Sequence, residues 1–333
     1  MEYFSESTLE DVYRYRAEDL SWPEIGRKLD VHPERIRSAF RRWKRTNRLT
    51  MWDGVLGPIR PVKVKFDKKA ASRDLTKISS GVVTQVIFGD VHVPYHDRRV
   101  WRLLIEVIEM SKPDSIVHVG DHLDAYMLSD FMKDPNRKET LQDEINIAKG
   151  LLAEVRMAAP KARIDLLEGN HEERLRRALW RAPTTQAVLL ALTDVQRILT
   201  WPKLLSLDDM GIFWHPNDTV VKIAPRFYAH HGNTKGDPFH RFGVSGVSGH
   251  SHTMKLQSRR TLPENLEWFT VGTLGTLDPE YDIKPSWQHG FWVITHRVQE
   301  DGTVTRASEQ VNITYNERND NYEAVFRGRL LIS

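Results

Sequence analysis

The chain has 333 residues, an ordinary globular composition, a net charge of +3 and no cysteine. The lack of cysteine excludes disulfides, a cysteine nucleophile and thiolate metal sites. No apolar stretch approaches the roughly 20 residues that cross a membrane, and the acidic start predicts no secretory signal. We therefore expect a cytoplasmic protein with no membrane partner, whose metal ligands would be His, Asp, Glu or Asn.

Positive charge is concentrated near the N-terminus. Residues 35–77 contain 14 Lys or Arg and three acidic residues, a net charge of +11, so the rest of the chain carries −8. A basic segment joined to an acidic body indicates a polyanionic partner for that segment. The alternative is a solvated linker with surface lysines.

The pattern of residues 7–48 predicts three short helices. A Ser21-Trp22-Pro23-Glu24 capping box opens the second helix. Pro33 opens the third helix after a three-residue turn. Three apolar side chains of that third helix share one face, and basic side chains crowd another. The apolar residues are Ile36, Phe40 and Trp43.

A helix with an apolar stripe and an arginine-rich flank, placed after a short turn, resembles the helix-turn-helix modules of phage and bacterial proteins. The resemblance implies a DNA-binding domain over residues 1–50 and DNA as a partner. It also allows a homodimer, because such proteins often dimerise. A helical cap packed on the main domain is the alternative. The implied DNA contacts are Arg37, Arg41, Arg42, Lys44 and Arg45.

Residues 51–81 contain glycines, prolines and many lysines, and we interpret them as a basic linker, with 62–66 as a candidate edge strand. From residue 82, strands at 82–88, 115–119 and 164–167 alternate with helices at 100–110 and 141–159. This alternation predicts an α/β domain with a largely parallel sheet. Further strands are expected at 211–215, 219–223, 226–230, 266–271 and 291–298. Residues 319–333 have no clear assignment and are taken as a tail.

Three predicted strands end in the same way, with an apolar run followed by glycine and a side chain that can bind metal. In a parallel sheet, the carboxyl ends of the strands form the binding crevice, so these side chains should meet at one edge. Glycine lets the backbone turn sharply before each of them. The three endings are Gly89-Asp90, Gly120-Asp121 and Gly169-Asn170.

Histidines complete this candidate site. His92 and His171 follow two of the strand endings, His231 ends a later strand, and His250 and His252 flank one residue. A carboxylate has two oxygens and can bridge two cations, and Asp121 is the natural candidate for this role. A mixed shell of oxygen and nitrogen suits manganese, iron or zinc better than calcium.

Five ordered motifs over residues 82–318 resemble those of the calcineurin-like metallophosphoesterases. They are Asp90-Val91-His92, Gly120-Asp121-His122-Leu123-Asp124, Gly169-Asn170-His171-Glu172, His231-Gly232 and Gly249-His250-Ser251-His252. The resemblance implies a four-layer αββα sandwich that holds two divalent ions. Manganese is the expected metal, with iron, zinc, nickel or magnesium as alternatives.

The same resemblance implies a ligand set for each ion. One ion would take Asp90, His92, Asp121 and His252, and the other Asp121, Asn170, His231 and His250. His230 is the rival of His231. The remaining histidines are expected to be packed or surface residues. These are His32, His118, His122, His215, His240, His289 and His296.

Two ions close together can activate a water and bind phosphate oxygens. His171 would then be the general acid or charge stabiliser at the leaving oxygen. In the family pattern it is oriented by Asp124, which would fix its tautomer. Arg174 and His96 are candidate substrate contacts. Their alternatives are a helix-surface arginine and a hydrogen-bonded loop histidine.

Three functions compete. The first is a DNA phosphodiesterase tethered by its N-terminus, a pairing that resembles phage-encoded nucleases and would act in the host cytoplasm. The second is a nucleotide phosphatase or cyclic-nucleotide phosphodiesterase with the N-terminus as a cap or oligomerisation element. The third is a non-enzymatic DNA-binding or scaffold protein, which the intact ligand set argues against. Ala125 after Asp124 departs from the phosphoprotein phosphatases, which carry arginine there. Asp124 itself departs from the double-strand-break repair nucleases, which carry histidine there.

Overall fold

The structure is a computed structural model. It describes residues 4, 8–9, 11–12, 15, 20–37, 39–40, 64–130, 140–181, 191–217, 220–232, 236–262, 265–277 and 286–333. The chain divides into two compact units. The first comprises residues 1–61, 134–137 and 315–321, and the second contains the remainder. Among the described residues, no helix is long and apolar enough to cross a membrane.

The first unit has a small apolar core of its own. Helix α2 (Trp22–Leu29) begins as predicted, because the Glu24 carboxylate accepts the Ser21 backbone N–H at 2.8 Å. Residues 33–37 and 39–40 are helical as well. The core side chains come from three segments, in agreement with the predicted periodicity. They are Leu9, Val12, Trp22, Ile25, Ile36 and Phe40.

The expected DNA contacts of this unit are placed only in part. Arg37 is buried, and its guanidinium forms an ion pair with Glu34 at 3.1 Å. Its side chain is therefore not on an exposed basic face, because the helix turns position 37 toward the interior of the unit. The other four predicted contacts lie outside the described residues, as does Trp43. These four are Arg41, Arg42, Lys44 and Arg45.

An eight-stranded mixed sheet forms the centre of the second unit, in the order β13-β12-β11-β10-β1-β2-β3-β4. Strands β1 to β4 are parallel, as the alternation of strands and helices predicts, and β10 runs antiparallel to β1. The strands are β1 (Gly81–Phe88), β2 (Ser115–His118), β3 (Arg163–Leu167), β4 (Ile212–His215), β10 (His289–Val298), β11 (Val304–Asn316), β12 (Asn321–Phe326) and β13 (Arg329–Ile332).

A second sheet has the order β5-β6-β7-β9-β8, with β6, β7 and β9 parallel. Its inner face packs on the first sheet, because alternate residues of each strand point to opposite faces. Thus Ile87 of β1 lies in the core between the sheets, whereas Val86 and Phe88 lie in the core under the helices. The strands are β5 (Val221–Ala224), β6 (Phe227–His230), β7 (Ser245–Ser248), β8 (Lys255–Arg260) and β9 (Asn265–Thr270).

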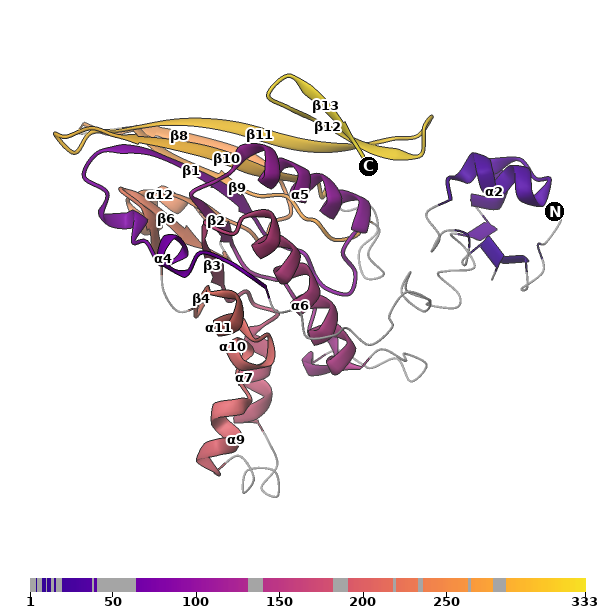
Figure 1. The fold of residues 1–333 in the computed structure, drawn as a ribbon, viewed down its shortest axis with the longest axis horizontal. Helices are drawn as coiled ribbons and strands as arrows, with labels where there is room; N and C mark the ends of the chain where they lie inside the picture. Colours follow the sequence, from indigo (N-terminus) through magenta and orange to yellow (C-terminus); the bar gives the residue numbers. More distant parts are fainter. Residues whose placement is uncertain are drawn as a thin grey trace. The chain divides into compact units, whose positions relative to one another are not determined.

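Helices cover the other face of the first sheet. The amphipathic helices α5 (Arg98–Ser111) and α6 (Leu141–Ala158) lie side by side there (Figure 1). On the outer face of the second sheet, the short α12 (Pro238–Phe242) packs its Phe239 against Trp268. The described part of the chain therefore has the predicted layers, with a fourth layer reduced to this helix. The remaining helices are α4 (Lys68–Ala71), η1 (Leu75–Lys77), η2 (Tyr126–Leu128), α7 (Glu173–Trp180), α9 (Thr193–Ile198), α10 (Trp201–Leu204) and α11 (Leu207–Met210).

Two expectations about the ends of this domain differ from the structure. Residues 64–80, expected to be linker, pack on the domain: Leu75 is buried, and the Asp67 backbone N–H donates to the Pro160 carbonyl at 2.9 Å. The described part of the candidate edge strand, residues 64–66, is not a strand. The segment taken as a tail forms the β12–β13 hairpin, because its alternating apolar residues, such as Phe326, complete the core beside α5.

Candidate metal centre

The strand ends of both sheets bring the predicted metal ligands together. Asp90 and His92 follow β1, Asp121 follows β2 and Asn170 follows β3. From the second sheet, three histidines follow β6 and β7, and they are His231, His250 and His252. The parallel direction of these strands explains the convergence, because their carboxyl ends lie at a common edge.

The first group of donors surrounds one point. The Nε2 atoms of His92 and His252 are 3.0 Å apart. Nε2 of His252 is 3.1 Å from Oδ1 of Asp90, and Nε2 of His92 is 3.9 Å from Oδ2 of Asp121. Asp90, His92 and His252 each offer an atom within 4.8 Å of the others. Two ring nitrogens and carboxylate oxygens facing one another in this way match a divalent transition metal.

The second group shares Asp121. Nε2 of His231 is 3.2 Å from Oδ2 of Asp121 and 3.0 Å from Oδ1 of Asn170. Nδ1 of His250 is 2.8 Å from the same Asn170 oxygen. Nδ1 of His231 lies 2.7 Å from the Val119 carbonyl. A proton on that nitrogen leaves the Nε2 lone pair directed into the centre, the usual arrangement of a histidine ligand.

The backbone at these ligands is strained. Asp90, His92, Asp121, His250 and His252 all have positive φ, between 51° and 69°. Each such residue costs about 1–2 kcal/mol relative to the usual region. Strain of this kind persists where the surrounding structure enforces it, and it clusters at functional sites.

The glycines beside the ligands are needed for close approach. A Cβ at Gly249 would lie 2.5 Å from Oδ2 of Asp90. At Gly120, where φ is +100°, it would lie 2.7 Å from Nδ1 of His231. A Cβ at Gly169 would overlap Asp121. The predicted sharp turn therefore accounts for Gly120, whereas Gly169 and Gly249 leave room for a ligand carboxylate.

Glu172 connects the loops that carry the ligands. Its buried carboxylate accepts the backbone N–H groups of Asp121 at 3.0 Å, Leu123 at 2.8 Å and Gly169 at 2.8 Å. Burial and the nearby Asp121 raise the pKa of Glu172 to about 7. Sequence reasoning placed Glu172 in a motif without giving it a role, although a charged residue directly after two site residues was a usable signal.

The carboxylates and imidazoles of the centre shift one another's pKa values. Burial alone would lower the pKa of His231, but the Asp121 carboxylate outweighs it and raises the pKa to about 10. Burial would likewise raise the pKa of Asp121, yet the surrounding imidazoles hold it well below its usual range. Burial and the neighbouring His171 lower the pKa of His92. The carboxylates therefore favour positive charge at His231, whereas burial opposes it at His92, and the donor set itself is what fits metal ions.

His171 and Asp124 lie against this centre. Nδ1 of His171 is 3.2 Å from Oδ1 of Asp124 and 2.8 Å from its backbone oxygen. Nε2 of His171 is 3.9 Å from Oδ2 of Asp121. Burial opposes protonation of His171, but the carboxylates of Asp121 and Asp124 raise its pKa to about 9. Arg174 reaches the same place: Nη1 donates to the Asp124 carbonyl at 2.6 Å, and Nη2 lies 3.3 Å from Nε2 of His171.

Two other candidate histidines lie apart from the centre. His230, the rival of His231, accepts the Gly232 backbone N–H at 2.9 Å through Nδ1 and packs on Phe242. Burial lowers its pKa to about 4. His96, a candidate substrate contact, is buried, and burial lowers its pKa to about 3. Its ring therefore lies within the protein rather than on an open surface.

The histidines expected to be structural include a buried chain behind the site. Nε2 of His118 is 3.0 Å from Nδ1 of His122, and Nε2 of His122 is 3.1 Å from the Ala148 carbonyl. The Gly120 backbone N–H donates to Nδ1 of His118. These contacts fix both rings as neutral tautomers, since each nitrogen has one donor or acceptor role. Burial lowers the pKa of both.

Trp287 is a neighbour of the site that the sequence did not single out. Its ring centroid lies 4.2 Å from that of His252, in an edge-on arrangement. A lone tryptophan between two predicted strands carries no sequence signal of this contact.

Comparisons with known proteins give distant similarities. No protein-family model matches the sequence. The chain is 24% identical over 232 residues to the Gene 54 protein of Mycobacterium phage D29, and 25% identical over 233 residues to the Gene 54 protein of Mycobacterium phage L5. Each match covers 63% of this chain and 88% of the phage protein.

Several solved structures also match. Vps29 from Cryptosporidium parvum is 14% identical, with 76% of this chain and 96% of that chain covered and a TM-score of 0.36. YfcE, a phosphoesterase from E. coli, is 11% identical, with 67% of this chain and 98% of that chain covered and a TM-score of 0.33. Vps29 complexed with Zn²⁺ from Entamoeba histolytica is 13% identical, with 68% of this chain and 98% of that chain covered and a TM-score of 0.32. At these identities and TM-scores, the likenesses do not establish the family of the chain.

Proposed function

We propose that the chain is a two-metal-dependent phosphoesterase whose substrate is a phosphodiester in DNA. The observation that carries the proposal is the position of Asp121 between two sets of histidines. Its Oδ2 lies 3.9 Å from Nε2 of His92, which also groups with Asp90 and His252, and 3.2 Å from Nε2 of His231, which groups with His250. A bridging carboxylate between two histidine-rich groups is suited to two divalent ions of the manganese, iron or zinc type.

The metals, when bound, would activate water and bind phosphate oxygens. The protein holds its side chains ready for that task. Glu172 ties together the loops of Asp121 and Gly169 through three backbone N–H groups. Asp90 accepts the His250 backbone N–H at 2.9 and 3.0 Å, which joins the two sheets at the site. A centre fixed from both sheets loses little order when a substrate binds.

His171 is placed to assist the leaving oxygen. The Asp124 contacts at Nδ1 orient the ring and turn Nε2 toward the centre. A protonated Nε2 in this position can donate to the oxygen that leaves phosphorus. Arg174, next to Nε2, adds a fixed positive charge for the phosphate. His171 belongs by distance to one donor group, with His92 and Asp121, so its role as a ligand is the competing assignment.

DNA is the substrate that the basic N-terminal segment favours, through residues 35–77 with their net charge of +11. The similarity to phage proteins is consistent with an enzyme that acts on DNA in the host cytoplasm. Tethering to the duplex would raise the local substrate concentration without new contacts at the active site. Hydrolysis of free nucleotides, with the N-terminus as a cap, is the rival that the same experiment tests.

The experiment compares cleavage of duplex DNA with hydrolysis of a small chromogenic phosphodiester, both with manganese. In a quadruple variant, Arg41, Arg42, Lys44 and Arg45 become glutamine. We expect the variant to lose DNA cleavage. Its DNA binding should also depend less on salt: the slope of the logarithm of the binding constant against the logarithm of the salt concentration should weaken by about 0.9 for each phosphate that the protein no longer neutralises. Hydrolysis of the small diester should not change. Equal DNA cleavage by both proteins would remove the N-terminal unit from the function.

A further inference from the structure

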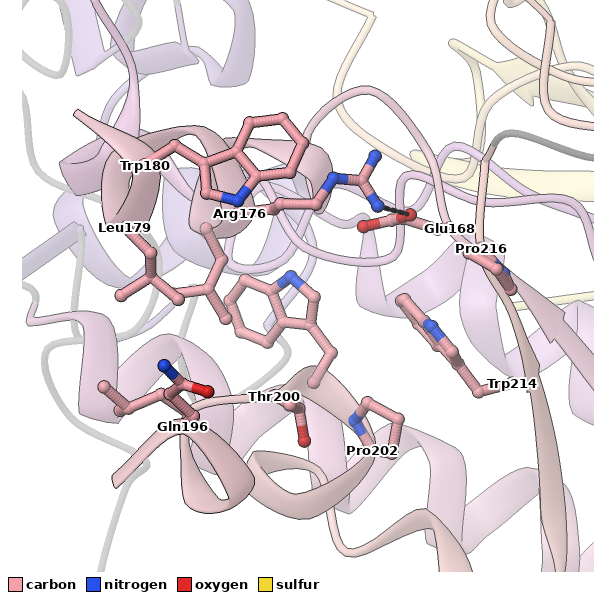
Figure 2. Close-up of a pocket in the computed structure, with 12 residues that line it drawn as sticks. Glu168, Arg176, Leu179, Trp180, Gln196, Thr200, Pro202, Trp214 and Pro216 are labelled. Atoms are coloured by element: carbon pink, nitrogen blue, oxygen red, sulfur yellow. Dashed lines mark hydrogen bonds and ion pairs between the residues drawn. The ribbon is translucent and has the colours of Figure 1, made fainter. Parts of the chain in front are cut away.

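A pocket of about 430 Å³ includes Glu168 from the end of β3, the strand that also leads to Asn170, and the proposed chemistry does not use it (Figure 2). This volume is in the range of small-ligand sites. Three tryptophans from different elements line it, namely Trp180 of α7, Trp201 of α10 and Trp214 of β4. Figure 2 shows Trp180 and Trp214 on different sides of the pocket. The pocket therefore presents flat aromatic surfaces beside an aliphatic wall that includes Leu175, Leu179 and Leu199.

A polar edge accompanies these rings. Oε2 of Glu168 accepts the Arg176 Nη1–H at 3.1 Å and the Asn217 backbone N–H at 2.9 Å. The Arg176 guanidinium in turn lies over the Trp180 ring at 5.6 Å. Glu168 is only 4% exposed, and its Oε1 has no hydrogen bond to any residue that the structure describes. In Figure 2 this second oxygen points toward the pocket. This oxygen is not fully enclosed by protein, so a ligand in the pocket can reach it and donate an N–H to it.

The pocket and the metal centre share one loop. Glu168 at the pocket is two residues before Asn170 at the centre, and both follow β3. Nε1 of Trp201 donates to the Glu172 backbone oxygen at 2.7 Å. Trp214 comes from β4, the parallel neighbour of β3. The carboxyl ends of adjacent parallel strands open to the same side, so the pocket and the metal centre lie at the same end of the sheet.

We infer that this pocket binds a nucleobase with an exocyclic amino group, belonging to the nucleotide whose phosphate is held at the metal centre. The inference rests on the proposed phosphoesterase function and narrows its substrate to nucleotide esters. A base offers a flat face to the indoles and an amino N–H to the free oxygen of Glu168, as carboxylates accept from the amino group of cytosine. An aliphatic peptide side chain would fill the pocket but leave that oxygen without a donor.

The first test needs no metal. Deoxycytidine, which lacks phosphate, is titrated into the full chain in the presence of a chelator, and tryptophan fluorescence reports binding. Trp180 is 76% exposed, so Trp180→Ala should fold normally. We expect it to weaken binding about 5-fold or more, the loss typical of one stacked base. Trp180→Phe should retain most of the affinity, and Met157→Ala, an exposed apolar residue of α6, should have no effect.

The second test uses two esters with the same leaving group, the 5′-p-nitrophenyl ester of deoxycytidylate and methyl p-nitrophenyl phosphate. Trp180→Ala should raise KM about 5-fold or more for the first ester and leave the second unchanged. Glu168→Gln should remove a preference for deoxycytidine over thymidine in the binding assay. If neither ester is hydrolysed while deoxycytidine still binds through Trp180, the phosphoesterase function fails and the base site stands. Hydrolysis of both esters with no selective effect of Trp180→Ala would overturn the base site.

Discussion

Replacing Gly249 by alanine tests whether the geometry of the Asp90 carboxylate matters to the metal centre. The new Cβ would lie 2.5 Å from Oδ2 of Asp90 and 3.1 Å from a Val119 methyl group. Real Cβ atoms essentially never come within 3.0 Å of another heavy atom. The carboxylate must therefore move by about 0.5 Å or more, which should disturb the hydrogen bond that it accepts from the His250 N–H at 2.9 and 3.0 Å.

A displacement of about 1 Å at a reacting group costs on the order of 100-fold in rate, so about 0.5 Å should cost roughly 10-fold in kcat. The overpacking should also lower the free energy of unfolding by about 1–3 kcal/mol. The assay is hydrolysis of a chromogenic phosphodiester with manganese, beside a urea unfolding curve.

Gly302→Ala provides the control for this variant. Its Cβ would meet nothing within 4 Å, although φ is +81°. It should lose about 1–2 kcal/mol of stability from backbone strain while keeping wild-type kcat. If Gly249→Ala retains wild-type kcat and metal content, Asp90 does not require its observed position, and the reasoning is wrong.

Three further predictions concern catalysis, pH and the core. His171→Ala should lower kcat by on the order of 10²–10⁴-fold and keep the metal content measured by emission spectroscopy; loss of metal would make His171 a ligand. Burial lowers the pKa of His96 and His296 to about 3, and unfolded histidine titrates near 6.5. Between about pH 3 and pH 6.5, the unfolded state therefore binds more protons than the folded state. The contribution of these two rings to the free energy of unfolding is at its full value above about pH 6.5, and on acidification it falls by about 1.4 kcal/mol per pH unit for each ring. Urea unfolding at pH 7 and pH 5 measures this, and equal stabilities would contradict it. Arg156→Met should destabilise by about 3 kcal/mol or more in the same assay, because the buried guanidinium donates to the carbonyls of Ala159, Ala162, Met210 and Gly211 at 2.7–3.1 Å. A loss below about 1 kcal/mol would mean that water replaces the guanidinium.

The first half of the main domain was predictable because local pattern and tertiary role agree there. The strand at 82–88 and the helix at 141–159 match β1 and α6 to within a residue at each end. Apolar parallel strands buried on both faces and amphipathic helices have distinct periodicities. The convergence of Asp90, Asp121 and Asn170 followed from the rule about strand ends.

Other strands were missed because their sequences lack an apolar pattern. Strand β8 (Lys255–Arg260) is exposed along its whole length and pairs antiparallel with β9. Strand β7 (Ser245–Ser248) is buried, yet it contains serine and glycine, because Gly246 lies against the Trp268 ring. Pairing partners far away in sequence determine both strands, and no local signal reports them.

The residues that meet at the candidate site were predictable, whereas the residues that support them were not. Glu172 acts through three backbone N–H groups from two loops, a role that depends on how those loops meet. The aromatic pocket is assembled from α7, α10 and β4, whose tryptophans follow no common sequence pattern. For Arg37, the helical periodicity indicated an arginine on an exposed basic face, whereas its side chain is buried.

The most direct test of the account is the number of metal ions bound by the folded protein. Emission spectroscopy of protein prepared with excess manganese should find two ions per chain. Asp121→Ala, which removes the carboxylate shared by the donor groups of His92 and His231, should bind neither ion tightly while remaining folded by circular dichroism. A folded wild-type protein without bound metal, or an Asp121→Ala variant that keeps both ions, would contradict the proposed metal centre.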